Sequence, residues 1–229
     1  QHLYEGIETE NGDHIAFITY MRTDSVRISA EAQQSALARI REVYGDEYAP
    51  EKPNFYATKK GAQDAHEAVR PIDLSMTPEK AKKLLDRKHF ALYKLIYERF
   101  LASQMAEAKY NSTQMEIDNS GYIFKASGRV LLFAGYTKIY QEAAPRKEDE
   151  DEPSSSKLLP DLKEGDTLDL VSMNKEQKFT KPPLRYTDAS LVKAMEVKGI
   201  GRPSTYATII SKLNQKYLKK DCLLYTSDA

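Results

Sequence analysis

The chain has 229 residues and a mass of 26.0 kDa, room for one large domain or two small ones, and its 41% hydrophobic content suffices for a packed core. This composition excludes an intrinsically disordered chain. The 34 basic side chains balance 34 acidic ones, so net charge alone indicates no polyanionic partner. The balance is uneven along the chain: residues 181–220 carry nine basic and two acidic side chains, a net +7, whereas residues 141–180 carry six and eleven, a net −5. A basic region beside an acidic one is typical of a protein in which one part faces a phosphate backbone.

Targeting signals and cysteines limit the cellular setting. No apolar run reaches the roughly 18–20 residues that span a bilayer, and the N-terminus lacks the pattern of a secretory signal. We therefore expect a cytoplasmic protein with no membrane partner. The single cysteine, Cys222, excludes an internal disulfide and a cysteine-based zinc cluster. Because the first residue is Gln1 rather than Met, we expect the sequence to begin inside a longer protein.

The first hundred residues favour helices. Residues 13–20 form a mostly apolar predicted strand that ends at a tyrosine. Ser29 as N-cap and Gly45 as stop enclose a predicted helix, and residues 63–70 predict a short helix ended by Pro71. Thr77 and Pro78 begin another helix. A longer helix follows, with a broad apolar stripe made of Phe90, Leu92, Tyr93, Ile96, Tyr97, Phe100 and Leu101.

After Ala108 the hydrophobic period changes from 3.6 to 2. The pattern predicts strands over residues 110–117, 122–126, 129–139 and 167–173, with residues 118–121 as a hairpin turn. The acidic, Ser-rich stretch at 147–156 predicts a loop. Helices return over residues 188–197, capped by Thr187, and over residues 204–215.

Three short constellations could carry chemistry. Tyr20 ends a strand, where a tyrosine is by default a rim residue, but Arg22 two positions later could hold a phosphate with its planar fork. A phenol next to an arginine can capture a phosphodiester covalently. Residues 63–71 crowd His66 with charged side chains, and the alternative for them is a plain surface helix. Residues 198–206 place Gly201, Arg202 and two hydroxyls before a helix, where anions bind, although a simple cap and turn has the same composition.

In combination and order, these motifs resemble the signatures of the type IA DNA topoisomerases, in particular their bacterial topoisomerase I branch. The matching stretches are Ile18-Thr19-Tyr20-Met21-Arg22-Thr23-Asp24-Ser25, residues 63–71 and residues 199–206. Met21 favours the bacterial topoisomerase I branch, because topoisomerase III relatives usually carry Pro there. The resemblance covers about residues 1–220.

The resemblance implies specific roles for these residues. Tyr20 matches the nucleophile that becomes linked to the 5′ phosphate of a cut strand, Arg22 the arginine that positions the scissile phosphate, and His66 a histidine close to the site. The matches in the groove that binds single-stranded DNA are Arg202, Ser204, Thr205 and Lys216. Lys216 stands where relatives often carry Arg, which keeps the charge but not the bidentate geometry.

The implied fold is an α+β multidomain protein. It would consist of a helical gate domain with the active-site tyrosine (1–107), a β-rich arch or hinge domain (108–180) with an acidic loop (145–157), and the start of a helical basal domain, the basic DNA-binding segment 181–220. Residues 221–229 depart from the family pattern, so their origin is doubtful.

The implied activity is to cut one DNA strand, pass another strand and religate, which relaxes negative supercoils without ATP. We expect a monomer that acts chiefly on single-stranded DNA. The intact enzyme would use Mg²⁺ held by the acidic triad of a Toprim domain, which nothing in this sequence matches, so we expect the chain alone to bind no metal and to be inactive. Alternatives are a topoisomerase III-like relative, the topoisomerase half of a reverse gyrase, or a catalytically silent module that binds single-stranded DNA.

Overall fold

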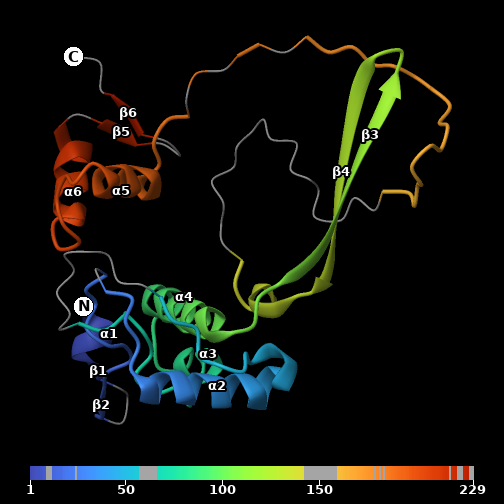
Figure 1. The fold of residues 1–229 in the computed structure, drawn as a ribbon. Helices are drawn as coiled ribbons and strands as arrows, with labels where there is room; N and C mark the ends of the chain where they lie inside the picture. The colour runs from blue at the N-terminus through green and yellow to red at the C-terminus, as the bar shows by residue number, and fades with distance from the viewer. Residues whose placement is uncertain are drawn as a thin grey trace. The chain divides into compact units, whose positions relative to one another are not determined.

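The computed structural model describes residues 1–8, 12–23, 25–56, 66–141, 159–177, 179–180, 182, 184–216, 218–220 and 224–226; for the last two ranges it describes the backbone only. The chain divides into two compact units, Gln1–Lys163 and Glu164–Ala229, and each is described by itself (Figure 1). None of the helices within the described ranges has the length and apolar character needed to cross a membrane. The predicted acidic loop, 145–157, lies outside the described residues.

The segment that leads to Tyr20 begins with α1 (His2–Glu5) and an antiparallel pair of short strands, β1 (Ile7–Glu8) and β2 (His14–Ile15). The strand predicted over residues 13–20 is therefore limited to β2. Beyond it, the amides of Phe17 and Ile18 both donate to the Leu3 carbonyl, at 2.8 and 3.2 Å, and Ile18 forms a single bridge with Pro71. The bridge does not extend into a regular ladder, because the Phe17 amide donates to Leu3 and the Arg70 amide donates to the Thr19 hydroxyl.

The helix predicted after Ser29 is confirmed as α2 (Ala30–Tyr44). The Ser29 hydroxyl accepts a hydrogen bond from the Ala32 amide at 3.3 Å, and Gly45 ends the helix. The buried side chains repeat at helical spacing and include Ala32, Ala36, Leu37 and Ile40. A 3₁₀ turn, Asp46–Tyr48, follows.

The two helices predicted after residue 76 are also confirmed, as α3 (Pro78–Ala81) with Thr77 as N-cap and α4 (Arg87–Gln104) with Asp86 as N-cap. The apolar stripe of α4 is narrower than predicted, because Leu92 is 49% exposed. The helices pack with the segment before Tyr20 around one core that includes Leu3, Phe17, Ile18, Ile40, Tyr93, Phe100, Leu101 and Met105. Because Phe17 and Ile18 are only 2% exposed, the core anchors the chain directly before the tyrosine.

The tyrosines of this core make the folding stability depend on alkaline pH. Burial raises the pKa values of three tyrosines above the usual 10.0: that of Tyr93 by a large amount, and those of Tyr97 and Tyr44 as well. Above about pH 10 the unfolded chain therefore releases protons that the folded chain keeps, so the contribution of these tyrosines to the free energy of unfolding is constant below this pH and falls above it. We expect Tyr93→Phe to make this alkaline fall shallower in urea unfolding series. At neutral pH it should destabilise the chain by about 1–3 kcal/mol, because the Met76 carbonyl loses its bond from the Tyr93 hydroxyl.

The control for this experiment is Tyr122→Phe, since Tyr122 is 75% exposed. It should change neither the neutral stability nor the alkaline slope. If the free energy of unfolding fell equally steeply with pH in Tyr93→Phe and in the unsubstituted chain, the raised pKa of Tyr93 would not explain the alkaline fall.

A long antiparallel hairpin follows the helices: β3 (Lys109–Asn119) and β4 (Tyr122–Phe133), with Tyr110 opposite Leu131 (Figure 1). The predicted turn at residues 118–121 is confirmed, and Ser120 and Gly121 both have positive φ there. The break expected between residues 126 and 129 was wrong, because Ser127 and Gly128 pair within the ladder. The chain leaves β4 at Phe133 and forms a 3₁₀ helix, Gly135–Lys138, where the strand was expected to continue to residue 139.

Gly135 is required where the hairpin meets the helical core. Its φ is +49°, and a β-carbon there would lie 2.5 Å from the carbonyl oxygens of Ala106 and Glu107. We expect Gly135→Ala to destabilise the chain by about 2–5 kcal/mol in urea unfolding, the sum of left-handed strain and overpacking against rigid backbone. The matched control is Gly121→Ala, whose φ is +86° but whose β-carbon would meet nothing within 4 Å, so only the strain of about 1–2 kcal/mol should remain. Equal losses in the two variants would contradict the steric argument.

The second unit contains α5 (Asp188–Val197) and α6 (Tyr206–Lys216), followed by the short antiparallel strands β5 (Leu218–Lys220) and β6 (Leu224–Thr226). The cap predicted at Thr187 is confirmed by a reciprocal capping box with Ser190. The last helix begins two residues later than predicted. The strand predicted over residues 167–173 was wrong: these residues form neither helix nor strand, and Val171 is 95% exposed. Alternating apolar residues make a strand only where a partner strand completes the ladder, and none of the described strands pairs with this segment.

Candidate active site

Tyr20 lies at the surface between two other aromatic rings. Its side chain is 42% exposed. The ring of His66 stacks on it with centroids 5.5 Å apart and an interplanar angle of 28°, and Tyr4 packs edge-on at 5.2 Å. The structure therefore brings together Tyr20 and His66, two predicted site residues that lie 46 positions apart in the sequence.

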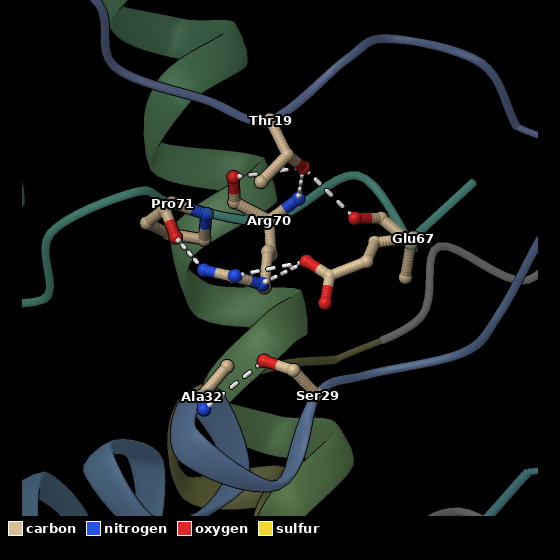
Figure 2. A network of polar contacts seen from close by, with 7 residues as sticks. Thr19, Ser29, Ala32, Glu67, Arg70 and Pro71 are labelled. Atoms are coloured by element: carbon tan, nitrogen blue, oxygen red, sulfur yellow. Dashed lines mark hydrogen bonds and ion pairs between the residues drawn. The ribbon is translucent and has the colours of Figure 1, made fainter. Parts of the chain in front are cut away.

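A short pairing of two chain segments holds these residues together. The Thr19 amide donates to the Arg70 carbonyl at 2.9 Å, and the Ile72 amide donates to the Phe17 carbonyl at 3.1 Å. Figure 2 shows how the Thr19 hydroxyl adds further bonds to the same segment. Residues 63–65 of the predicted short helix lie outside the described residues, and residues 66–70 are not helical because their backbone groups bond to other segments, as the Ala68 amide does to Arg27.

The His66 ring is half-buried and oriented by its surroundings. Its Nδ1 atom is buried and finds no hydrogen-bond partner among the described residues. Nε2 is therefore the ring nitrogen left to contact an anion. A histidine beside a phenol can donate a hydrogen bond to a phosphate oxygen.

Arg22 stands two residues after Tyr20 on the same loop, with its side chain half-buried. A guanidinium so close in sequence to a phenol can hold the anion that the phenol attacks. The structure thus brings the Tyr20 and His66 rings together from two segments that the pairing of residues 17–19 with 70–72 aligns, and Arg22 follows on the loop of Tyr20. Within the described ranges, no group of three or more His, Cys, Asp or Glu side chains could hold a metal ion.

A cleft of about 820 Å³ opens beside this site rather than at it. Met21, Thr23 and Ser25 of the tyrosine loop line one side, and Leu92 and Ile96 of α4 line another. Tyr20, Arg22 and His66 are not among its lining residues. The Tyr20 side chain, which is 42% exposed, is nevertheless accessible to a long polymer from solvent.

The other predicted binding residues lie in the second unit, around the start and the end of α6. Gly201 has a φ of +76°, and Arg202 and Ser204 are exposed in the turn that follows. The Thr205 hydroxyl accepts from the Arg202 amide at 2.9 Å and so closes the turn. This bond is compatible with both interpretations of the motif, an anion site and a simple cap and turn. Lys216, the last residue of α6, is exposed.

Two residues with no role predicted from the sequence belong to the neighbourhood of Tyr20. Tyr4 packs against the Tyr20 ring, and Thr19 bonds to the segment that carries His66. Thr19 could have been noticed as a polar residue between a buried strand and the candidate nucleophile. No signal in the sequence indicates the contact of Tyr4.

Comparison with known proteins gives one consistent family. The sequence matches the family described as DNA topoisomerase over residues 1–228. It is 46% identical to DNA topoisomerase 1 of Campylobacter jejuni, over 94% of this chain and 29% of that protein, and 47% identical to DNA topoisomerase 1 of Fervidobacterium islandicum, over 93% and 30%. The structure resembles full-length topoisomerase I from Thermotoga maritima with a TM-score of 0.79 and 41% identity, over 99% of this chain and 35% of that one. The chain thus spans less than a third of the length of these two sequence relatives.

Proposed function

Because the chain belongs to the bacterial type IA DNA topoisomerase family, we propose that it carries the nucleophile with which such an enzyme cuts one strand of DNA. The observation that carries this proposal is the stacking of Tyr20 on His66 at 5.5 Å, on a surface that a polymer can reach. Arg22 on the same loop supplies the cation that the chemistry needs.

The reaction is a transesterification. The Tyr20 oxygen bonds to the phosphorus of a phosphodiester, the bond from phosphorus to the 3′ oxygen of the preceding nucleotide breaks, and the phenolic proton ends on that 3′ oxygen. The number of phosphate ester bonds does not change, so religation by the reverse step requires no ATP. Passage of another strand through the break while the 5′ end stays on Tyr20 would relax negative supercoils.

Arg22 and His66 stabilise this step. The guanidinium of Arg22 would hold the scissile phosphate and offset the charge that develops on its oxygens. The His66 ring, stacked on the nucleophile, would keep the phenol oriented and offer Nε2 to a phosphate oxygen. An ordinary phenol is mostly protonated at neutral pH, so such neighbours decide whether it reacts.

The second unit would bind the same DNA away from the cut. The predicted DNA contacts stand at the two ends of α6, within residues 181–220, whose net charge is +7. They are Arg202, Ser204 and Thr205 before the helix and Lys216 at its end. Such a surface attracts the phosphates of single-stranded DNA and should bind it in a salt-dependent manner. Within this function, residues 1–107 act as the gate that carries Tyr20, residues 108–180 as the arch, and residues 181–220 as the start of the base.

Mg²⁺ is proposed for the intact enzyme only. The described residues do not form a site that fits the ion, so no step of the proposal on this chain passes through it. The resemblance to type IA topoisomerases implies that the metal is held by the acidic residues of a Toprim domain. We therefore expect the 229-residue chain by itself not to cleave DNA.

The test is to join this chain to a Toprim domain from a relative, add Mg²⁺ and 3′-labelled single-stranded DNA, and look for a protein–DNA adduct that survives denaturation. The 3′ label is needed because Tyr20 retains the downstream fragment. A labelled adduct supports the proposal. Salt-sensitive binding without any adduct would indicate a silent module that binds single-stranded DNA instead, and cleavage by the chain alone would contradict the role given to the Toprim domain.

A further inference from the structure

We propose that Thr19 is a positioning residue, whose hydroxyl sets the register between the segment that carries Tyr20 and the segment that carries His66. The inference rests on the function proposed above and extends it to a residue outside the reacting groups. Its basis is a set of bonds around one half-buried side chain.

Thr19 bonds to the neighbouring segment with both its backbone and its side chain. Its amide donates to the Arg70 carbonyl at 2.9 Å. Its hydroxyl, whose bonds Figure 2 draws, accepts from the Arg70 amide at 3.0 Å and donates to the Ala68 carbonyl at 2.9 Å. In a regular antiparallel pair the Arg70 amide would donate to the Thr19 carbonyl instead. The hydroxyl takes the place of that carbonyl, so the ladder ends at Thr19 and the next residue, Tyr20, leaves it.

Only a hydroxyl side chain can make this junction. It must accept one hydrogen bond and donate another at the same time, which serine and threonine do and valine cannot. Valine has nearly the same shape, so it would keep the packing but leave the Arg70 amide and the Ala68 carbonyl without their partner in a half-buried place.

The segment that receives these bonds is itself fixed. Arg70, whose side chain is 17% exposed, forms an ion pair with Glu67 at 2.9 Å and donates to the Pro71 carbonyl at 3.0 Å (Figure 2). The Ala68 amide donates to the Arg27 carbonyl at 2.8 Å. Thr19 therefore ties the nucleophile's loop to a support that other contacts hold.

The two bonded partners lie close to the two rings. Thr19 directly precedes Tyr20, and Ala68 follows His66 by two residues. A slip of one residue along an extended chain moves side chains by about 3.3 Å. Loss of the hydroxyl would thus separate or tilt the stacked rings, and a misplacement of about 1 Å is enough to slow a reaction about 10²-fold.

The experiment compares Thr19→Val with Thr19→Ser in the chain joined to a Toprim domain, with Mg²⁺ and 3′-labelled single-stranded DNA. We expect Thr19→Val to lower the single-turnover cleavage rate at saturating DNA by about 10²-fold and to leave the Kd for DNA unchanged, because binding does not depend on ring alignment. Thr19→Ser keeps the hydroxyl and should restore most of the rate. The matched control is Thr77→Val, which removes a hydroxyl that caps α3 and should lower stability but not the cleavage rate.

A second measurement needs no cleavage. In the 229-residue chain alone, NMR shifts of the His66 ring protons report the ring current of Tyr20, and Thr19→Val should move them while Thr19→Ser and Thr77→Val should not. If the unsubstituted chain joined to the Toprim domain forms no adduct, the proposed function fails and the NMR shifts still decide the positioning role. If it forms an adduct and Thr19→Val cleaves at the same rate, the positioning role is overturned. If Thr19→Val does not fold, Thr19→Ser decides, since a large loss of rate with the hydroxyl retained would also overturn it.

Discussion

Tyr20→Phe is expected to abolish the covalent adduct with DNA while the chain still folds and binds single-stranded DNA. The substitution removes the one oxygen that would bond to phosphorus and keeps the ring that stacks on His66. Because Tyr20 is 42% exposed, loss of its hydroxyl should change the free energy of unfolding by no more than about 0.5 kcal/mol. The measurement is the denaturation-resistant adduct with 3′-labelled DNA, after a Toprim domain and Mg²⁺ are supplied, together with urea unfolding and DNA binding.

Tyr4→Phe is the matched control. Tyr4 is 39% exposed and packs edge-on against Tyr20, so it shares the neighbourhood and the accessibility of the candidate nucleophile. This variant should form the adduct at the normal rate. An adduct that persists in Tyr20→Phe and disappears in Tyr4→Phe would identify Tyr4 as the nucleophile. An adduct that persists in both variants would contradict the role proposed for Tyr20.

The helices of the fold could be predicted from the sequence because their signals are local. Ser29, Thr77 and Thr187 each cap a helix where expected, and each cap depends on residues within one turn of the chain. The strands were harder, because a strand depends on a partner that may be distant in sequence. The hairpin of β3 and β4 was predictable from its adjacent turn, whereas residues 167–173 have a strand's alternation and no described partner.

For the candidate site, the sequence indicated which residues to consider but not how they meet. The motifs around Tyr20 and His66 were visible as separate stretches. Their contact depends on the bridge between Ile18 and Pro71 and on the bonds of Thr19, which are long-range and leave no periodic pattern. The expected short helix over residues 63–70 shows the same effect, because bonds to Arg27 and Thr19 replace helical bonds over the described residues 66–70.

Arg22→Ala is expected to lower the cleavage rate by about 10²–10³-fold at saturating DNA, which is the usual cost of removing one group that stabilises charge in a transition state. Attack by the Tyr20 oxygen would add charge to the oxygens around phosphorus, and a guanidinium can meet two of them at once. Arg22→Lys keeps the charge but loses the fork, so its rate should lie between those of the alanine variant and the unsubstituted chain. The measurement is the single-turnover rate of adduct formation, with the Kd for DNA determined separately.

The control for Arg22 is Arg27→Ala, which removes the side chain of an exposed arginine five residues further along the chain.

If Arg22 acts only by non-specific electrostatic attraction of DNA, both variants should weaken binding alike, and both should cleave at the normal rate once the DNA is saturating. If Arg22 acts on the scissile phosphate, only Arg22→Ala should remain slow once the DNA is saturating, because the interaction it loses strengthens as charge develops on phosphate. The salt dependence of binding separates the two cases further, since a purely electrostatic role would lower the salt slope equally in the two variants.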